Sequence, residues 1–157
     1  MRFIDSNVFI HAYIKPKRKL KEHERRIKER AKAIIKSVNN GEEVLTTVVH
    51  ISEIANLLED FMPLKNVLDI VRGILLKSNI HVVEVSYEDY LTALSIAEKA
   101  VIGLNDALAY VIMLQKGVKE IYSFDKDFDK LDKTLRVTKT SARKPTSFRR
   151  GMNRRYA

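Results

Sequence analysis

The sequence predicts an α/β protein, with a central parallel sheet of four to five strands and helices on both of its faces. Short β-branched runs alternate along the chain with segments whose apolar residues recur at helical spacing, and this alternation is typical of parallel sheets. The chain has 157 residues, of which 45% are hydrophobic, and it contains only five glycines and three prolines. That composition suits a single globular domain with a substantial core, and no internal repeat is visible.

The first half of the chain predicts the order strand, two helices, strand, two helices. Pro16, the Asn-Asn-Gly sequence at 39–41 and Pro63 separate the helical segments, because these residues end helices or prevent their continuation. The expected elements are a strand at 2–5, a helix through Val8, Phe9, Ala12 and Tyr13, a helix through Ala31, Ile34, Ile35 and Val38, a strand at 43–47, a helix from about 49 to 62, and a helix with Val67, Leu68, Val71, Ile74 and Leu75 on its apolar face.

The second half continues the alternation and adds an acidic turn. Ser86 and Asp89 have the spacing of a capping box, in which two side chains satisfy the first backbone amides of a helix. We expect a strand at 80–85, a helix from Ser86 to Gly103, a helix from Asn105 and Asp106 to Gly117, a strand at 120–124, an acidic turn at 125–132 and a fifth strand at 135–138.

Positive charge is concentrated in two segments of the chain. The formal net charge is +9, from 29 Lys and Arg against 20 Asp and Glu. Residues 15–30 hold nine basic and three acidic residues, and residues 139–157 hold seven basic residues and no acid. A mildly acidic body with two basic appendages is the pattern expected of a protein that binds a polyanion such as nucleic acid. The alternative interpretation is a solvated helix face and a disordered tail.

The composition also excludes several kinds of site. Because the chain has no cysteine, it has no disulfide, no thiolate nucleophile and no Cys-ligated zinc. No run of about 18 apolar residues predicts a membrane span, and the N-terminus lacks the pattern of an export signal. We therefore expect a cytoplasmic protein with no membrane partner. The four histidines lie far apart without ligand-like spacing, so ordinary surface or core positions are expected for them.

Four carboxylates stand at positions where they can meet. Asp5 ends the first strand, Asp125 follows the fourth strand, Asp106 begins a helix, and Glu53 lies among apolar residues of the helix after the second strand. Sites in doubly wound parallel sheets lie beyond the carboxyl ends of the strands, so we expect these acids to converge there. A carboxylate that is removed from water must be paired with an opposite charge, hydrogen-bonded or bound to a metal.

Converging carboxylates predict a divalent cation, because without one they repel and raise each other's pKa. Oxygen ligands without cysteine or a histidine cluster favour Mg²⁺ or Mn²⁺ over zinc. Such an ion can lower the pKa of a water and stabilise charge on a phosphoryl oxygen. Phosphodiester cleavage is therefore the expected chemistry, and the basic segments would hold the nucleic-acid backbone.

Each acid also has an ordinary structural interpretation. Asp5 could cap the helix that follows it, and Asp106 could simply oppose the dipole of its own helix. Asp125 could form an Asx-type turn. Glu53 could be a surface residue of an amphipathic helix. The occurrence of all four in one pattern favours the metal site.

The chain resembles a known family in four sequence motifs: FIDSNVFIHAYI at 3–14, TTVVHISEIANLL at 46–58, LNDALAYVIMLQKG at 104–117 and IYSFDKDFDKL at 121–131. In this order, and with an acid in each, they resemble the PIN domain nucleases, which include the VapC toxins of prokaryotic toxin–antitoxin modules. The resemblance covers residues 1–138 and leaves a basic tail, residues 139–157, outside it. It implies a three-layer α/β/α domain and metal-dependent cleavage of single-stranded or exposed RNA, by a toxin or by an RNA-processing nuclease.

The resemblance also implies roles for individual residues. It assigns catalysis and the binding of Mg²⁺ or Mn²⁺ to Asp5, Glu53, Asp106 and Asp125. It assigns supporting roles to Ser6, Asn7, Ser123 and Asp127. Ser6 and Asn7 match a small polar pair that would orient the first carboxylate or a water. Ser123 stands where the family often has threonine, and Asp127 matches a frequent second acid in the last motif.

RNA is the expected substrate, and basic side chains from both basic segments are expected to contact it. The residues expected to bind RNA are Lys17, Arg18, Lys19, Arg143, Lys144, Arg149 and Arg150. In the tail, Phe148 and Tyr156 are interleaved with arginines, an arrangement that can stack on unpaired bases. The family resemblance further implies an antitoxin partner, if the protein is a toxin, and a homodimer.

Two other classes of function stay open at this stage. A PIN-like RNA-binding or scaffold protein with weak catalysis has the same fold, although a binding module gains little from four clustered acids. A phosphatase or phosphoacceptor domain also uses an aspartate after the first strand. That class predicts a second acid two residues later, where this chain has Asn7.

Overall fold

The computed structural model describes residues 1–140 and contains one five-stranded sheet. All four pairs of neighbouring strands are parallel, in the order β3-β2-β1-β4-β5. The strands are β1 (Arg2–Ile4), β2 (Val44–Thr47), β3 (Ile80–Val83), β4 (Glu120–Tyr122) and β5 (Leu135–Val137). The predicted parallel α/β architecture is therefore confirmed, with the fifth strand present.

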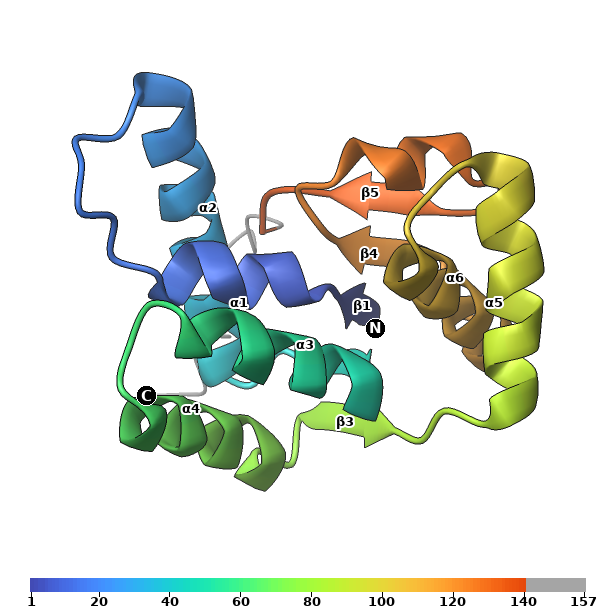
Figure 1. Ribbon diagram of the computed structural model, residues 1–157, viewed down its shortest axis with the longest axis horizontal. Helices are drawn as coiled ribbons and strands as arrows, with labels where there is room; N and C mark the ends of the chain where they lie inside the picture. Colours follow the sequence, from blue (N-terminus) through green and yellow to red (C-terminus); the bar gives the residue numbers. More distant parts are fainter. Residues whose placement is uncertain (141–157) are drawn as a thin grey trace, which may run out of the picture.

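Helices cover both faces of this sheet. Figure 1 shows α5 and α6 on one side and α1 to α4 on the other. The helices are α1 (Ser6–Tyr13), α2 (Glu22–Asn39), α3 (Val48–Glu59), α4 (Leu64–Leu76), α5 (Tyr87–Ala100) and α6 (Leu104–Lys116), and a short 3₁₀ helix, η1 (Lys126–Lys130), precedes β5. None of the helices within residues 1–140 has both the length and the apolar character needed to span a membrane.

The alternation of side chains along the strands divides the interior into two hydrophobic cores. Ile4 and Tyr122 face the core formed with α1, α2, α3 and α4. Phe3 and Ile121 face the core formed with α5, α6 and η1. Because neighbouring strand residues point to opposite faces, strands buried on both faces have near-continuous apolar sequences, as the first and fourth strands do here.

The strand order reverses at β1, and this position determines where a site can form. The chain passes from β1 outward to β2 and β3 on one side, and then returns to place β4 and β5 on the other. The backbone N–H of Asp5 continues the ladder by donating to the carbonyl of Tyr122 at 3.0 Å. The residues that follow β1 and β4 therefore lie side by side at the point where ligands bind in open parallel sheets.

The capping box predicted for α5 is present, but the end of that helix is not where the sequence predicts it. Asp89 N–H donates to Ser86 Oγ at 3.1 Å, and Ser86 N–H donates to the Asp89 carboxylate at 2.9 Å. The helix ends at Ala100, and Val101 takes the left-handed conformation with φ of 55°. Gly103, predicted to end α5, is instead the N-cap of α6.

Candidate active site

Asp5 lies at the centre of the strand ends and is only 3% exposed. It occupies the N-cap position of α1, but its side chain makes no capping hydrogen bond to that helix. Its carboxylate instead accepts a hydrogen bond from Ser123 Oγ at 2.8 Å, and Ser6 Oγ lies 3.4 Å from its other oxygen. Helix capping therefore does not account for this buried carboxylate.

Ser123 connects the end of β4 to Asp5. While its hydroxyl donates to Asp5, its oxygen accepts from Asn7 Nδ2 at 3.2 Å and from the backbone N–H of Asp125 at 3.0 Å. Asn7 Oδ1 also accepts from the backbone N–H of Phe124 at 3.3 Å. A hydroxyl group has one donor and two acceptor positions, and all of those of Ser123 are used. The direction of the Asp5 carboxylate is fixed by this arrangement.

Glu53 is turned toward the same place from α3. It is half-buried, and Ser6 Oγ donates to its Oε1 at 2.5 Å. Asn105, in the first turn of α6, donates its side-chain N–H to Glu53 Oε2. Both oxygens of Glu53 therefore have partners from other helices, which an ordinary surface glutamate would not have.

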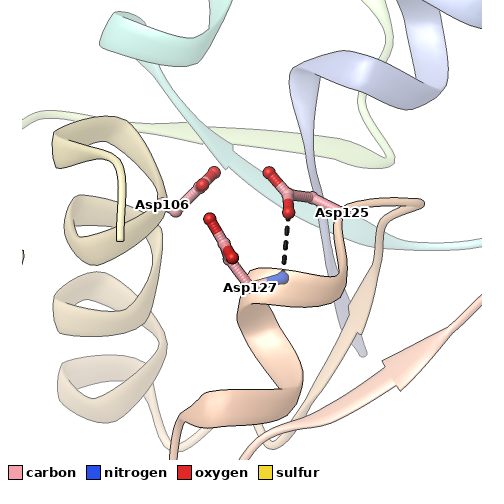
Figure 2. Close-up of side chains that lie close together, drawn as sticks. All are labelled: Asp106, Asp125 and Asp127. Carbon is pink, nitrogen blue, oxygen red and sulfur yellow. Dashed lines mark hydrogen bonds between the residues drawn. The ribbon is translucent and has the colours of Figure 1, made fainter. Parts of the chain in front are cut away.

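Asp106, Asp125 and Asp127 form the densest part of the site. One carboxylate oxygen from each lies within 4.8 Å of those of the other two, and all three side chains are partly buried. Figure 2 shows Asp106 on α6 facing Asp125 and Asp127, which lie at the start of η1. Asp127 N–H donates to Asp125 Oδ1 at 2.9 Å, so Asp125 also caps the short helix, as its Asx-turn interpretation requires.

Burial, together with the surrounding negative charge, raises the pKa of two of these acids. Burial raises the pKa of Asp106 to about 8, and the negative charges of Asp5 and Asp125 add to the effect. Burial likewise raises the pKa of Asp5 to about 6, although the hydrogen bond from Ser123 opposes the increase. Such acids are costly to ionise alone and are stabilised by a cation. An all-oxygen set of this kind fits Mg²⁺ or Mn²⁺.

The structure therefore brings together all eight acidic and supporting residues that the sequence indicated. Two further residues that the sequence did not single out lie beside them. Asn105 was expected only as the start of a helix, and no residue pattern shows that its amide binds Glu53. His50, expected to be an ordinary surface or core residue, is completely buried in the first turn of α3.

The predicted RNA-binding residues fall into two groups. Lys17, Arg18 and Lys19 are exposed between α1 and α2, where Arg18 makes two hydrogen bonds to Glu24, at 2.9 and 3.0 Å. Lys28, in the same basic segment, donates to the carbonyls of His11 and Ile14 and so binds the C-terminal end of α1. The predicted residues of the tail, Arg143, Lys144, Arg149 and Arg150, lie outside the described residues.

Comparisons with solved structures find the same fold in two bacterial structures. The structure of Mycobacterium tuberculosis VapC20, described as a toxin that cleaves the sarcin-ricin loop, matches with a TM-score of 0.65 at 20% identity. The match covers 82% of this chain and 93% of that chain. A toxin–antitoxin complex from Klebsiella pneumoniae matches with a TM-score of 0.59 at 10% identity, over 86% of this chain and 96% of that chain.

Comparison with protein families gives a direct assignment. A search of curated proteins finds no match. The family model described as PIN domain, however, matches residues 2–134, which include all the acidic residues of the site. The chain therefore belongs to the PIN domain family.

Proposed function

We propose that this protein is a metal-dependent endoribonuclease that hydrolyses phosphodiester bonds in single-stranded or exposed RNA. The observation that carries the proposal is the convergence of five carboxylates, Asp5, Glu53, Asp106, Asp125 and Asp127, beyond the strand ends of a PIN domain. The similarity to the VapC20 structure, described as that of a toxin that cleaves the sarcin-ricin loop, supports this choice of substrate. A role as the toxin of a toxin–antitoxin pair, or in RNA processing, follows from the same chemistry.

The five acids would hold Mg²⁺ or Mn²⁺. When bound, such an ion makes water more acidic and stabilises negative charge on a phosphoryl oxygen. Asp106, Asp125 and Asp127 offer oxygens close enough to share one cation. Asp5 and Glu53 are held in fixed directions by Ser123, Ser6 and Asn105, so that little reorganisation is needed when RNA arrives.

Basic residues would offset the repulsion between the acidic site and the RNA backbone. We assign this role to Lys17, Arg18 and Lys19 and to the tail, residues 139–157, which follows the nuclease domain at 1–138. Arg18 would exchange Glu24 for a phosphate, because an exposed ion pair contributes little stability. The added contacts to phosphate release counterions and make binding dependent on salt.

Two apolar surfaces suit protein partners. A groove of about 300 Å³ between α1, α2 and α4 is lined mainly by apolar side chains, including Phe9, Tyr13, Ile35, Val38 and Ile74. We propose that an antitoxin segment binds in this groove. The similarity to the Klebsiella pneumoniae toxin–antitoxin complex supports a partner of this kind. On α5, Tyr87, Leu91 and Leu94 are exposed at helical spacing, and we propose this row as the contact of a homodimer.

Cleavage of labelled RNA tests the proposed activity. Single-stranded and structured RNAs are incubated with the wild type, Asp106→Asn or Asp60→Asn, in Mg²⁺, Mn²⁺ or EDTA. Asp60 is an exposed carboxylate at the end of α3 and serves as the matched control. We expect metal-dependent cleavage that Asp60→Asn retains. The cleavage rate of Asp106→Asn should be more than about 100-fold below that of the wild type. Loss of a residue that only supports a metal ligand already lowers metal affinity or activity by about 10- to 100-fold.

The test also decides between catalysis and binding alone. If the wild type binds RNA but cleaves none under any metal, the alternative of a PIN-like RNA-binding or scaffold protein replaces the nuclease. Equal cleavage by the wild type and Asp106→Asn would show that the acidic cluster is not the catalytic site.

A further inference from the structure

His50 is a completely buried polar side chain at the base of the acidic site. Its Nδ1 lies 2.7 Å from Oγ1 of Thr47, the N-cap of α3. Its Nε2 has no hydrogen-bond partner within residues 1–140, although the backbone of Asn105 lies close enough to the ring to act on its pKa. The edge of the ring meets Phe3, with the ring centroids 5.0 Å apart. A buried imidazole nitrogen in this state needs an explanation, because an unmade hydrogen bond in the interior is costly.

The surroundings of His50 determine which nitrogen carries its proton. Burial lowers the pKa of His50 to about 4, so the ring is neutral at neutral pH. Thr47 Oγ1 already accepts from the backbone N–H of His50 at 3.2 Å, so its hydroxyl hydrogen is available for Nδ1. When that hydroxyl donates to Nδ1, the single proton of the neutral ring is on Nε2. The Asn105 backbone favours the protonated form of the ring, as a carbonyl acceptor does.

The first turn of α6 depends on contacts from outside its own helix. Its N-cap is Gly103, and no side chain caps it. This turn carries Asn105, which binds Glu53, and Asp106, which belongs to the aspartate cluster. Glu53 and His50 are three residues apart on α3, so they lie on one side of that helix. The side chain of Asn105 is thus held by Glu53, while its backbone faces His50.

We propose that His50 is a positioning residue that sets the spacing between α3 and α6. With Nδ1 anchored on Thr47, the Nε2–H group supports the backbone of Asn105, and this support keeps Asp106 at a fixed distance from Glu53. The inference rests on the proposed function, because it concerns the same acids as metal ligands. It adds a residue of another chemical type, outside the acidic cluster, on which metal affinity depends.

Three substitutions at His50 separate this role from simple filling of the core. His50→Phe keeps a ring but removes both nitrogens. His50→Gln places an amide N–H near the position of Nε2, whereas His50→Asn places its amide near Nδ1. His81→Phe changes an exposed histidine on β3 and is the matched control.

Mn²⁺ binding is measured by titration without RNA, RNA cleavage is followed as a function of Mn²⁺ concentration, and urea unfolding reports stability. We expect His50→Phe and His50→Asn to weaken Mn²⁺ binding by about 10-fold or more, which is the usual effect of losing a residue that supports a metal ligand. His50→Gln should restore most of the affinity, and His81→Phe should match the wild type. The KM for RNA should stay unchanged at saturating Mn²⁺. In the wild type, ¹⁵N spectra of His50 should show the proton on Nε2.

Several results would overturn the inference. Wild-type Mn²⁺ affinity in folded His50→Phe would make the residue a space-filling side chain. Equal losses in His50→Gln and His50→Asn would show that the Nε2–H donor does not matter, and this comparison stands even if His50→Phe fails to fold. A proton on Nδ1 would also contradict it. If the wild type neither binds Mn²⁺ nor cleaves RNA, the proposed function fails, while the ¹⁵N spectra still test the contact itself.

Discussion

Replacing Asp5 by asparagine should stabilise the metal-free protein and abolish its stabilisation by metal. The carboxyl of Asp5 is 3% exposed, and burial is the largest cause that raises its pKa from 3.8 to about 6. Each pKa unit corresponds to about 1.4 kcal/mol, so ionised Asp5 costs the fold roughly 3 kcal/mol. An asparagine carries no charge, and its Oδ1 can still accept from Ser123. Because burial of the amide also removes it from water at a cost, we expect the free energy of unfolding to rise by only about 1–2 kcal/mol.

The sign of this effect depends on pH. Below about pH 4 the carboxyl is neutral in both folded and unfolded chains, and its pKa contributes nothing. Between about pH 4 and 6 the unfolded chain ionises first, so wild-type stability falls as the pH rises. The pKa of Asp106, raised to about 8, extends this fall toward pH 8. Asp5→Asn should therefore be less stable than the wild type by about 1–2 kcal/mol near pH 4, where only the cost of the buried amide is left, and more stable than the wild type at pH 7.5.

Thermal unfolding in EDTA and in Mn²⁺ measures both parts of the prediction. A gain of 1 kcal/mol raises the Tm of a domain of this size by about 2–4 °C. In EDTA at pH 7.5, Asp5→Asn should melt several degrees above the wild type. Mn²⁺ at 100 times its Kd should add about 2.7 kcal/mol to the wild type and much less to the variant, reversing the order. A variant less stable in EDTA, or stabilised equally by Mn²⁺, would refute the reasoning.

Three other substitutions test separate features. Ser123→Ala removes the hydroxyl that donates to Asp5 and accepts from the N–H of Asp125. Urea unfolding should therefore show a free energy of unfolding about 1–3 kcal/mol lower than that of the wild type. A change near zero would contradict the role of this hydroxyl. Leu91→Asp places a charge in the exposed row of α5. If that row forms the proposed homodimer, light scattering should show a dimeric wild type and a monomeric variant; a dimeric variant would exclude this face. A chain ending at residue 138 should bind RNA more weakly and with a smaller salt dependence, which fluorescence anisotropy from 50 to 300 mM salt would measure. For single strands, each phosphate that the tail no longer neutralises should reduce the slope of log K against log salt concentration by about 0.7. An unchanged slope would exclude the tail from the interface.

Much of the fold could be predicted because local sequence and tertiary structure agree. The glycine and asparagine signals correctly end α2 and α6, where Gly117 takes the left-handed conformation. The end of α5 differs because Val101, a β-branched residue, takes the conformation that glycine was expected to supply. Packing between α5 and α6 determines that turn, and the local sequence therefore does not predict where α5 ends. The convergence of Asp5 and Asp125 followed from the rule for strand ends alone.

The parts of the site that sequence could not predict depend on contacts between distant elements. A single histidine in an apolar helix has no periodicity to show that its ring lies near the backbone of another helix, as that of His50 does. The basic run at 15–30 likewise does not reveal its internal pairing. Arg18 binds Glu24, and Lys28 binds the end of α1. Charge counts give the sign of a surface, but geometry decides which charges are available to a partner.

The hydrogen bond between Ser123 and Asp5 joins residues 118 positions apart. Contacts of such long sequence separation form late, because a large loop must close before they contribute. During synthesis, the first strand therefore leaves the ribosome long before the residues that complete its acidic site. A chain interrupted before residue 123 lacks Ser123, Asp125 and Asp127 altogether. Incomplete chains of this protein would thus carry no assembled acidic site, and the proposed nuclease activity would begin only when the domain is whole.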